Sequence, residues 1–99
     1  MPRPRKPRQC QCAALGTAFK PAGIPLVELE RLTLAADELE ALRLCDLLGL
    51  TQAEAGARMG VSRATVQRIV AGARNKVARA LVEGAALMLS PAAEGGGDD

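Results

Sequence analysis

The fold is decided by residues 51 to 70, which read TQAEAGARMGVSRATVQRIV. Two helix-forming runs flank Gly60, at a position where a turn needs a positive φ that glycine adopts without strain. Gly56 falls where only a small side chain lets two helices approach closely. With Gly60 as the ninth position of a two-helix motif, the positions that must be apolar hold Ala55, Met59, Val61, Val66 and Ile69. This pattern predicts a helix-turn-helix.

Both helices of the pair have recognisable first residues. Thr51 is followed three residues later by Glu54, which predicts a capping box at the start of the first helix. Ser62 is a favourable N-cap for the second helix, which is predicted to continue to about Glu83. Gly72 lies inside that helix, where glycine costs about 1 kcal/mol relative to alanine.

A further helix is predicted before the pair, from about Ala35 to Leu48, with Gly49 as the residue that follows its end. Its apolar residues lie on all sides of the helix rather than along one stripe. Such a helix must be covered on more than one side. Two alternatives remain open at this point: the preceding segment packs on its far face, or a second subunit does.

The chain divides into four parts. Residues 1–18 form a basic arm that is expected to be flexible, since prolines at positions 2, 4 and 7 keep its start extended. Residues 19–34 are predicted to form an irregular strap on the core, residues 35–89 the helix-turn-helix domain, and residues 90–99 a disordered acidic tail. Residues 27–34 and 86–89 each fit a short strand or a helical turn, and as strands the two segments would pair. The expected class is all-α, with three helices.

Composition excludes several functions. The chain of 99 residues has no histidine, tryptophan or tyrosine, and Phe19 is its single aromatic residue. It therefore offers no imidazole base and no aromatic platform for stacking single-stranded bases. We expect a protein that is not an enzyme, with no catalytic residues and no cofactor.

The cysteines indicate a reducing environment. There are three, an odd number, and the chain has neither a secretory signal nor a run of 18 apolar residues, which predicts a cytoplasmic protein without a membrane partner. Cys45 falls in a helical run and is expected to act as a small buried residue. Cys10 and Cys12 are too few for a structural zinc site, so no metal site is expected. A redox or metal role would require a dimer that pools their thiolates.

The net charge of +2 conceals alternating blocks. Residues 1–20 sum to +5 and residues 21–50 to −4, whereas residues 51–82 sum to +5 and residues 83–99 to −4. The arm and the helix-turn-helix are thus the two basic blocks, and a polyanion would be attracted to them first.

The predicted motif assigns contacts to duplex DNA. The second helix of such a pair enters the major groove by its N-terminal end, so the residues expected to face base edges are Ser62, Arg63, Ala64, Gln67 and Arg68. Backbone phosphate contacts are expected from Gln52, Thr65, Arg74, Lys76 and Arg79. The arm residues expected to reach the minor groove or phosphates are Arg3, Arg5, Lys6 and Arg8. With roughly six phosphate contacts, affinity should fall about a thousandfold between about 50 and 200 mM salt.

Several ordered segments carry a resemblance to a known family. They are MPRPRKPR at the start, FKPAGIP at 19–25, DELEALRL at 37–44, MGVSR at 59–63 and ARNKVARAL at 73–81. Together they resemble the prokaryotic domain-of-unknown-function family 134, described as predicted DNA-binding proteins. The helical part is in turn similar to region four of the primary bacterial sigma factor, which implies a helix-turn-helix that reads promoter DNA. Gly56 stands where the resemblance leads us to expect alanine.

Two functional hypotheses follow from the sequence. The first is a sequence-specific double-stranded DNA-binding protein, a transcriptional regulator acting as a homodimer, because one recognition helix covers too few base pairs for useful specificity. The alternative is a sigma-like interaction module that contacts the transcription machinery through the all-round apolar first helix. A cysteine-based redox-responsive or metal-responsive regulator is a variant of the first.

Overall fold

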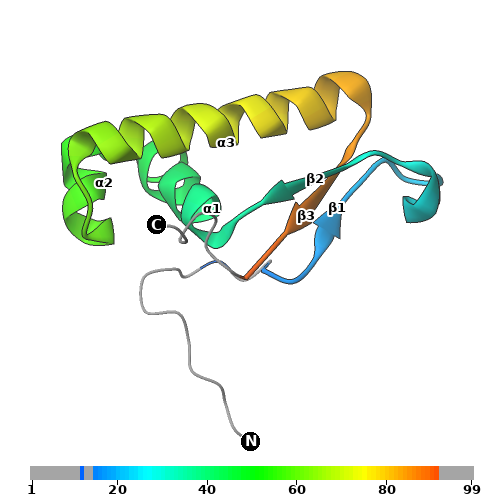
Figure 1. Cartoon of the computed structure of the whole chain (residues 1–99), viewed down its shortest axis with the longest axis horizontal. Coiled ribbons are helices and arrows are strands. Elements are labelled where there is room, and N and C mark those ends of the chain that lie inside the picture. Colours follow the sequence, from blue (N-terminus) through cyan, green and yellow to red (C-terminus); the bar gives the residue numbers. More distant parts are fainter. Residues whose placement is uncertain (1–11, 13–14, 92–99) are drawn as a thin grey trace, which may run out of the picture.

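Helix α3 (Arg63–Glu83) runs along the whole length of the molecule and organises the rest of the fold (Figure 1). The computed structural model describes Cys12 and residues 15–91. Helices α1 and α2 pack beneath the first half of α3, and a small sheet lies beneath its second half. In chain order the elements are β1 (Ala18–Phe19), the 3-10 turn η1 (Leu26–Glu28), β2 (Arg31–Leu34), α1 (Ala36–Leu42), the π-helical turn η2 (Arg43–Leu47), α2 (Gln52–Met59), α3 and β3 (Ala86–Leu89).

The starts of α2 and α3 are those that the sequence predicts. The Glu54 amide donates to Thr51 Oγ1 at 3.0 Å and the Thr51 amide donates to Glu54 Oε1 at 2.9 Å, which completes the capping box of α2. The Thr65 amide donates to Ser62 Oγ at 3.1 Å at the start of α3. Gly60 has a φ of 77° and reverses the chain between the two helices.

The predicted first helix is present, but its second half is not α-helical. Helix α1 ends at Leu42, and the π-helical turn η2 carries the chain on to Leu47. The Leu48 amide donates to the Arg43 carbonyl at 2.9 Å, five residues back, which is the hydrogen-bond pattern of a π-helix. Gly49 follows with a φ of 80°, as predicted for the residue after the helix end.

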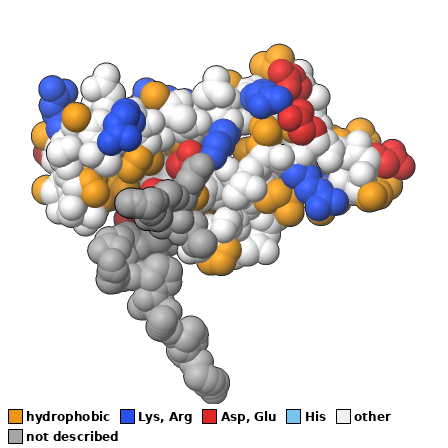
Figure 2. All heavy atoms as spheres, viewed as in Figure 1, with side chains coloured by type: hydrophobic (Ala, Val, Ile, Leu, Met, Phe, Trp, Pro, Cys, Tyr) orange, Lys and Arg blue, Asp and Glu red, His pale blue; other side chains and the backbone are white. Residues whose placement is uncertain are grey.

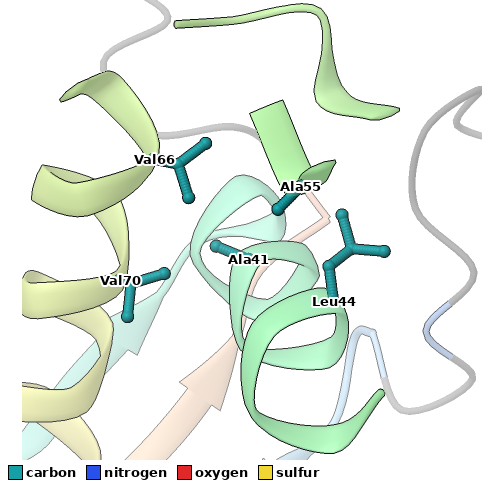
Figure 3. Packing of buried hydrophobic residues seen from close by; sticks show 5 residues of the cluster. All are labelled: Ala41, Leu44, Ala55, Val66 and Val70. Atoms are coloured by element: carbon teal, nitrogen blue, oxygen red, sulfur yellow. The ribbon is translucent and has the colours of Figure 1, made fainter. Parts of the chain in front are cut away.

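The core where α1, η2, α2 and α3 meet is built from small and branched side chains. Val66 and Val70 point from α3 toward Ala41 and Leu44 on the first helical segment and Ala55 on α2 (Figure 3). These side chains are fully buried, and partly buried residues close the cluster around them. The first two turns of α3 are therefore held by their inner face, which leaves the outer face to solvent.

The second half of α3 packs on a three-stranded sheet with the order β1-β3-β2. Strand β2 pairs parallel with β3, in a register that sets Arg31 opposite Ala86 and Leu34 opposite Leu89. Strand β1 pairs antiparallel with β3. Leu34 and Leu89 are buried against Ala73 of α3, so the sheet and the helix share a second apolar cluster.

The sheet corrects the expected fold class. The protein is mostly helical, with three α-helices in its described part, but it is not all-α, and the segment 19–34 is not an irregular strap throughout. The short strands satisfy backbone groups that an irregular segment would leave unpaired against the core. The pairing of residues 31–34 with residues 86–89 confirms the strand alternative that the sequence left open.

Other expectations concern residues outside the described part. They include the basic arm with Arg3, Arg5, Lys6 and Arg8 and the tail from residue 92 onward. Among the described residues, no helix is long and apolar enough to span a membrane.

Gly56 and Gly72 are expected to respond in opposite ways to alanine. A Cβ on Gly56 would lie 2.6 Å from the Val61 carbonyl oxygen, so the alanine must push α2 away from the turn. Overpacking of this kind costs about 1–3 kcal/mol, against a helix-propensity gain of about 1 kcal/mol. We expect Gly56→Ala to lower the free energy of unfolding by about 0–2 kcal/mol, the difference between these two effects.

Gly72→Ala is the matched control for this prediction. Its Cβ would meet Glu38 Oε2 at 3.5 Å, an ordinary van der Waals distance, within a regular helix. The substitution should raise the free energy of unfolding by about 1 kcal/mol. Urea denaturation of both variants measures the difference, and a Gly56→Ala variant as stable as Gly72→Ala would refute the close approach.

Candidate nucleic-acid interface

The six cationic side chains of α2 and α3 fall into two groups. Those in the second half of α3, namely Arg74, Lys76 and Arg79, each form ion pairs with acids on other elements. Those around the α2–α3 turn are Arg58, Arg63 and Arg68. Within the described part of the chain these three form no ion pair, so their charge is available to a partner.

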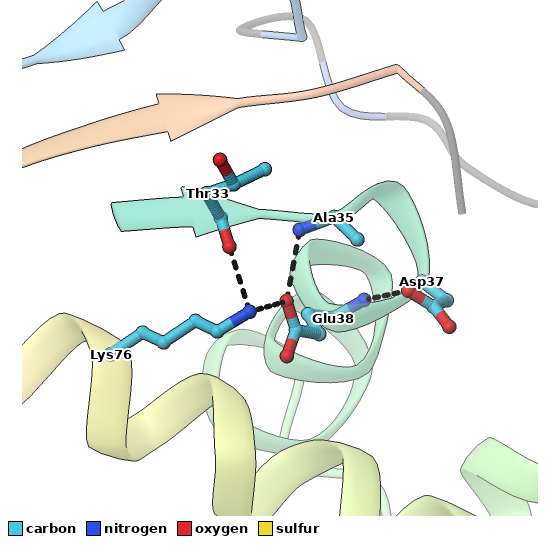
Figure 4. A network of polar contacts seen from close by, with 5 residues as sticks. All are labelled: Thr33, Ala35, Asp37, Glu38 and Lys76. Carbon is cyan, nitrogen blue, oxygen red and sulfur yellow. Dashed lines mark hydrogen bonds and ion pairs between the residues drawn. The ribbon is translucent and has the colours of Figure 1, made fainter. Parts of the chain in front are cut away.

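Lys76 is the most enclosed of the paired cations. Its ammonium group donates to Glu38 Oε1 at 2.8 Å and to the Thr33 carbonyl at 2.7 Å (Figure 4). The same carboxylate oxygen accepts from the Ala35 amide at 2.9 Å. Lys76 thus joins α3 to the end of β2 and the start of α1. Its role is to connect these elements, and its amino group points into the molecule.

Arg74 and Arg79 are paired at the surface. Arg74 forms two hydrogen bonds with Asp46, at 2.7 and 3.1 Å, and these bonds hold the pKa of Asp46 below its ordinary value. Arg79 contacts Glu83 at 3.0 Å and Glu30 at 2.8 Å. The hydrogen bond to Glu83, followed by the charge of Glu30, raises the pKa of Arg79. Both guanidinium groups are therefore neutralised by neighbouring carboxylates.

The predicted phosphate contacts of Arg74, Lys76 and Arg79 treated these residues as unpaired, and the structure places each of them in intramolecular ion pairs. Their partners lie 28, 38 and 49 residues away in sequence, beyond the reach of a helical-face pattern. A phosphate contact from Lys76 would have to displace Glu38 from a buried network. Arg74 and Arg79 would need to leave exposed ion pairs, which are weak.

The residues predicted to face base edges do share one exposed surface. Arg63, Ala64, Gln67 and Arg68 are all exposed on the first two turns of α3. Ser62 is also exposed, but its hydroxyl oxygen accepts from the Thr65 amide and lies 3.0 Å from Thr65 Oγ1. It acts first as the cap of the helix. The first turns of α3 thus present two guanidinium groups, one amide and one methyl group to solvent.

Gln52 and Thr65 lie at the starts of α2 and α3, as the sequence indicates, and are half-buried. Helix N-termini attract anions, because their unpaired amide groups and the helix dipole are both positive there. Arg58, on the last turn of α2, is an exposed cation near the same end of the molecule. It is absent from the DNA contacts predicted from the sequence. The signal for it was present in the sequence, since the residue lies one turn after Glu54 on the outer face of α2.

The surface reflects this division of charge. Figure 2 shows basic side chains standing apart from acidic ones at the end of the molecule formed by α2 and the start of α3. Toward the opposite end of the visible face, basic and acidic side chains lie next to one another. Among the cations of α2 and α3, those without an ion pair in the described part of the chain therefore lie around the α2–α3 turn.

The two described cysteines, Cys12 and Cys45, lie away from this surface. Cys45 is half-buried beside the α1–α3 core, and burial raises the pKa of its thiol. The Cys12 thiol lies 3.8 Å from Glu40 Oε1. Among the described residues no group of three or more potential ligands could hold a metal ion. Cys10 lies outside those residues, so a role for the Cys10 and Cys12 pair stays a prediction.

Fold and surface together define a small, mostly helical protein that presents two guanidinium groups at the start of a long, well-anchored helix. A family model described as "Protein of unknown function DUF134" matches residues 1–97. The chain belongs to this family, which confirms that part of the resemblance found in the sequence.

Close relatives come from several bacteria. The UPF0251 protein of Vibrio vulnificus strain CMCP6 is 57% identical over 89 residues, covering 90% of this chain and 89% of the relative. That of Shewanella baltica is 53% identical over 89 residues, covering 90% and 91%. That of Desulforudis audaxviator is 56% identical over 87 residues, covering 88% of this chain and 57% of the longer relative. No solved structure matches the chain.

Proposed function

We propose that this protein binds double-stranded DNA sequence-specifically and acts as a transcriptional regulator, with the first two turns of α3 in the major groove. The observation that carries the proposal is the exposed surface formed by Arg63, Gln67 and Arg68. The guanidinium groups of the two arginines have no acidic partner among the described residues. The same turns are fixed from behind by buried Val66 and Val70. A rigid helix end with unpaired cations suits a groove lined by phosphates and base edges.

The arrangement of α2, the turn and α3 supports a helix-turn-helix. Gly60 has the left-handed conformation such a turn requires, and Gly56 allows the turn to approach α2 closely. Ala55 and Val66 fill the space between the two helices. This arrangement is also what the sequence similarity to region four of the primary sigma factor implies, and in that class the second helix of the pair reads the major groove.

The exposed side chains can discriminate between base pairs. Arginine forms two hydrogen bonds with guanine O6 and N7, which suits Arg63 and Arg68, and glutamine can do the same with adenine N6 and N7, which suits Gln67. Ala64 offers a methyl-sized contact to the thymine methyl group. These are contacts to major-groove edges, so the site should prefer duplex over single-stranded DNA.

Contacts to the phosphate backbone would come from the same end of the molecule. The N-termini of α2 and α3, at Gln52 and Thr65, favour phosphate, and Arg58 adds an unpaired charge. The arm residues Arg3, Arg5, Lys6 and Arg8 would extend the contact along the duplex. Phosphate contacts from Arg74, Lys76 and Arg79 stay predictions, and to make them each residue would have to exchange its intramolecular carboxylate for a phosphate.

Equilibrium titration of fluorescent duplexes tests this function. We expect the full chain to bind a pool of genomic duplex fragments more tightly than single strands of the same length. The affinity should fall about a thousandfold between roughly 50 and 200 mM salt if about six phosphates are neutralised. Replacing all four arm cations by alanine should reduce the slope of log affinity against log salt by up to about 3–4, at about 0.9 for each lost contact.

Arg31→Ala is the control for the arm variant. Arg31 is an exposed arginine on β2, at the far end from the α2–α3 turn, so its removal changes net charge without touching the proposed surface. Its salt slope should match that of the unmodified protein. Equal affinity for single and double strands, or no binding at low salt, would contradict the proposed function.

A further inference from the structure

An open apolar groove separates α1 and η2 from the second half of α3. It has a volume of about 850 Å³. We call it the apolar groove, and its apolar lining from the helices consists of Leu39, Leu42, Leu47, Val77, Ala78 and Leu81, with Cys12 of the N-terminal segment at its edge. Leu47 and Leu81 are 76% and 78% exposed, although they belong to well-formed helical segments. Two large apolar side chains, Leu47 and Leu81, therefore project into solvent from the edges of the groove.

The charges beside the groove come as neutral pairs. Arg74 is bound to Asp46 at 2.7 Å, and Arg43 is bound to Glu40 at 2.9 Å. This surface has no excess of either sign and is unsuited to DNA or to a strongly charged peptide. Paired charges of both signs do suit a symmetric contact, in which the acid of one subunit meets the base of the other.

The chain's own remaining segments do not match the groove chemically. Residues 1–11 hold four cations and three prolines, and their one large apolar side chain is that of Met1. Residues 92–99 contain three acids, three glycines and two alanines. Neither segment supplies the leucine-sized side chains that would fill the groove. A second copy of the chain supplies such side chains, because Leu47 and Leu81 project from the same surface that contains the groove.

We propose that the apolar groove is the dimer interface of this protein. Two copies pack about a two-fold axis that passes beside α3 at the level of Ala78, and Leu47 and Leu81 of each copy enter the groove of the other. An isologous contact needs a surface that holds both the groove and the projecting side chains. This interface also accounts for the first helical segment, which is apolar on all sides and which the strap does not fully cover.

The position of the groove on α3 fits two DNA half-sites, a point that rests on the proposed function. The centre of residues 63–68 lies about 12 residues before Ala78, roughly 19 Å along the helix at about 1.5 Å per residue. Two copies related by an axis at the level of Ala78 would place these helix starts about 38 Å apart along the helix direction when the two α3 helices are antiparallel. Successive major grooves on one face of DNA are about 34–36 Å apart.

Sedimentation equilibrium of the full chain without DNA tests the interface. We expect a dimer, and we expect Leu47→Asp or Leu81→Glu to raise its dissociation constant roughly a hundredfold, since each buries a charge at the centre of the contact. Both positions are exposed in the single chain, so the fold should survive, which circular dichroism verifies. The control is Val27→Glu in η1, which removes an equally apolar residue, 78% exposed, that does not line the groove.

The outcomes separate this inference from the proposed function. A monomeric protein at every concentration would overturn it and leave the groove to another occupant. A dimer that persists unchanged in Leu47→Asp and Leu81→Glu would overturn it as well. A dimer lost in these two variants and kept in Val27→Glu supports it, whether or not the protein binds duplex DNA. Conversely, a monomer that binds duplex DNA would refute the dimer interface alone.

Discussion

Replacing Glu38 by alanine is expected to lower the free energy of unfolding by about 2–3 kcal/mol, which is less than the cost for a fully buried ion pair because the Lys76 side chain is 26% exposed. Glu38 is only 7% exposed, and its carboxylate accepts from both Lys76 and the Ala35 amide. Without it, the Lys76 ammonium would lose its 2.8 Å ion pair with this carboxylate. The start of α1 would also lose an acceptor for a backbone donor.

Urea denaturation with matched variants isolates the buried network. Glu83→Ala removes a carboxylate from an exposed pair with Arg79 and should cost less than about 1 kcal/mol. The double substitution Glu38→Leu with Lys76→Met removes both charges and should recover much of the loss, as replacement of a whole buried pair usually does. If Glu38→Ala is no more destabilising than Glu83→Ala, the network does not hold α3 to β2 and α1.

Replacing Arg68 by alanine is expected to relax the preference for the best duplex over a competitor by about 1–3 kcal/mol, or about fivefold to 150-fold. The reason is that a bidentate contact to guanine contributes to one sequence and not to others. Arg63→Ala should behave similarly at a different base pair. Titration of each variant with the preferred duplex, with duplexes changed at single positions and with a competitor measures the effect.

Arg79→Ala is the matched control on the same helix. The Arg79 guanidinium is held by Glu83 and Glu30, so its loss should change the affinity for every sequence only slightly and equally. A uniform loss of affinity on all sequences from Arg63→Ala and Arg68→Ala would identify them as phosphate contacts. In that case our assignment of base contacts to the start of α3 is wrong.

The helical part of the fold could be predicted because its signals are local. Thr51 with Glu54, Ser62 and Gly60 lie within a few residues of the boundaries that they set. The spacing of Ala55, Val66 and Val70 likewise depends only on the helical period. These features identified both helices of the pair and the buried face of α3 before the structure was known.

The sheet and the ion pairs could not be predicted in the same way. Strand β3 consists of alanine, leucine and methionine, which are equally compatible with a helix, and its partner β2 lies more than 50 residues earlier in the chain. The acids that neutralise Arg74, Lys76 and Arg79 are similarly remote. A count of charges along α3 therefore overestimated the cationic surface. The ion pairs seen in the folded chain show that the unpaired cations of α3 lie near the α2–α3 turn.

Selection of bound sequences from a random pool of duplex DNA by the full chain tests the central proposal most directly. We predict that the recovered duplexes share a short base pattern, and that the enrichment weakens in Arg68→Ala and in Gln67→Ala but not in Arg79→Ala. Recovered sequences that cannot be distinguished from the starting pool, or that are the same for Arg68→Ala as for the unmodified protein, would contradict the proposal that the start of α3 reads DNA.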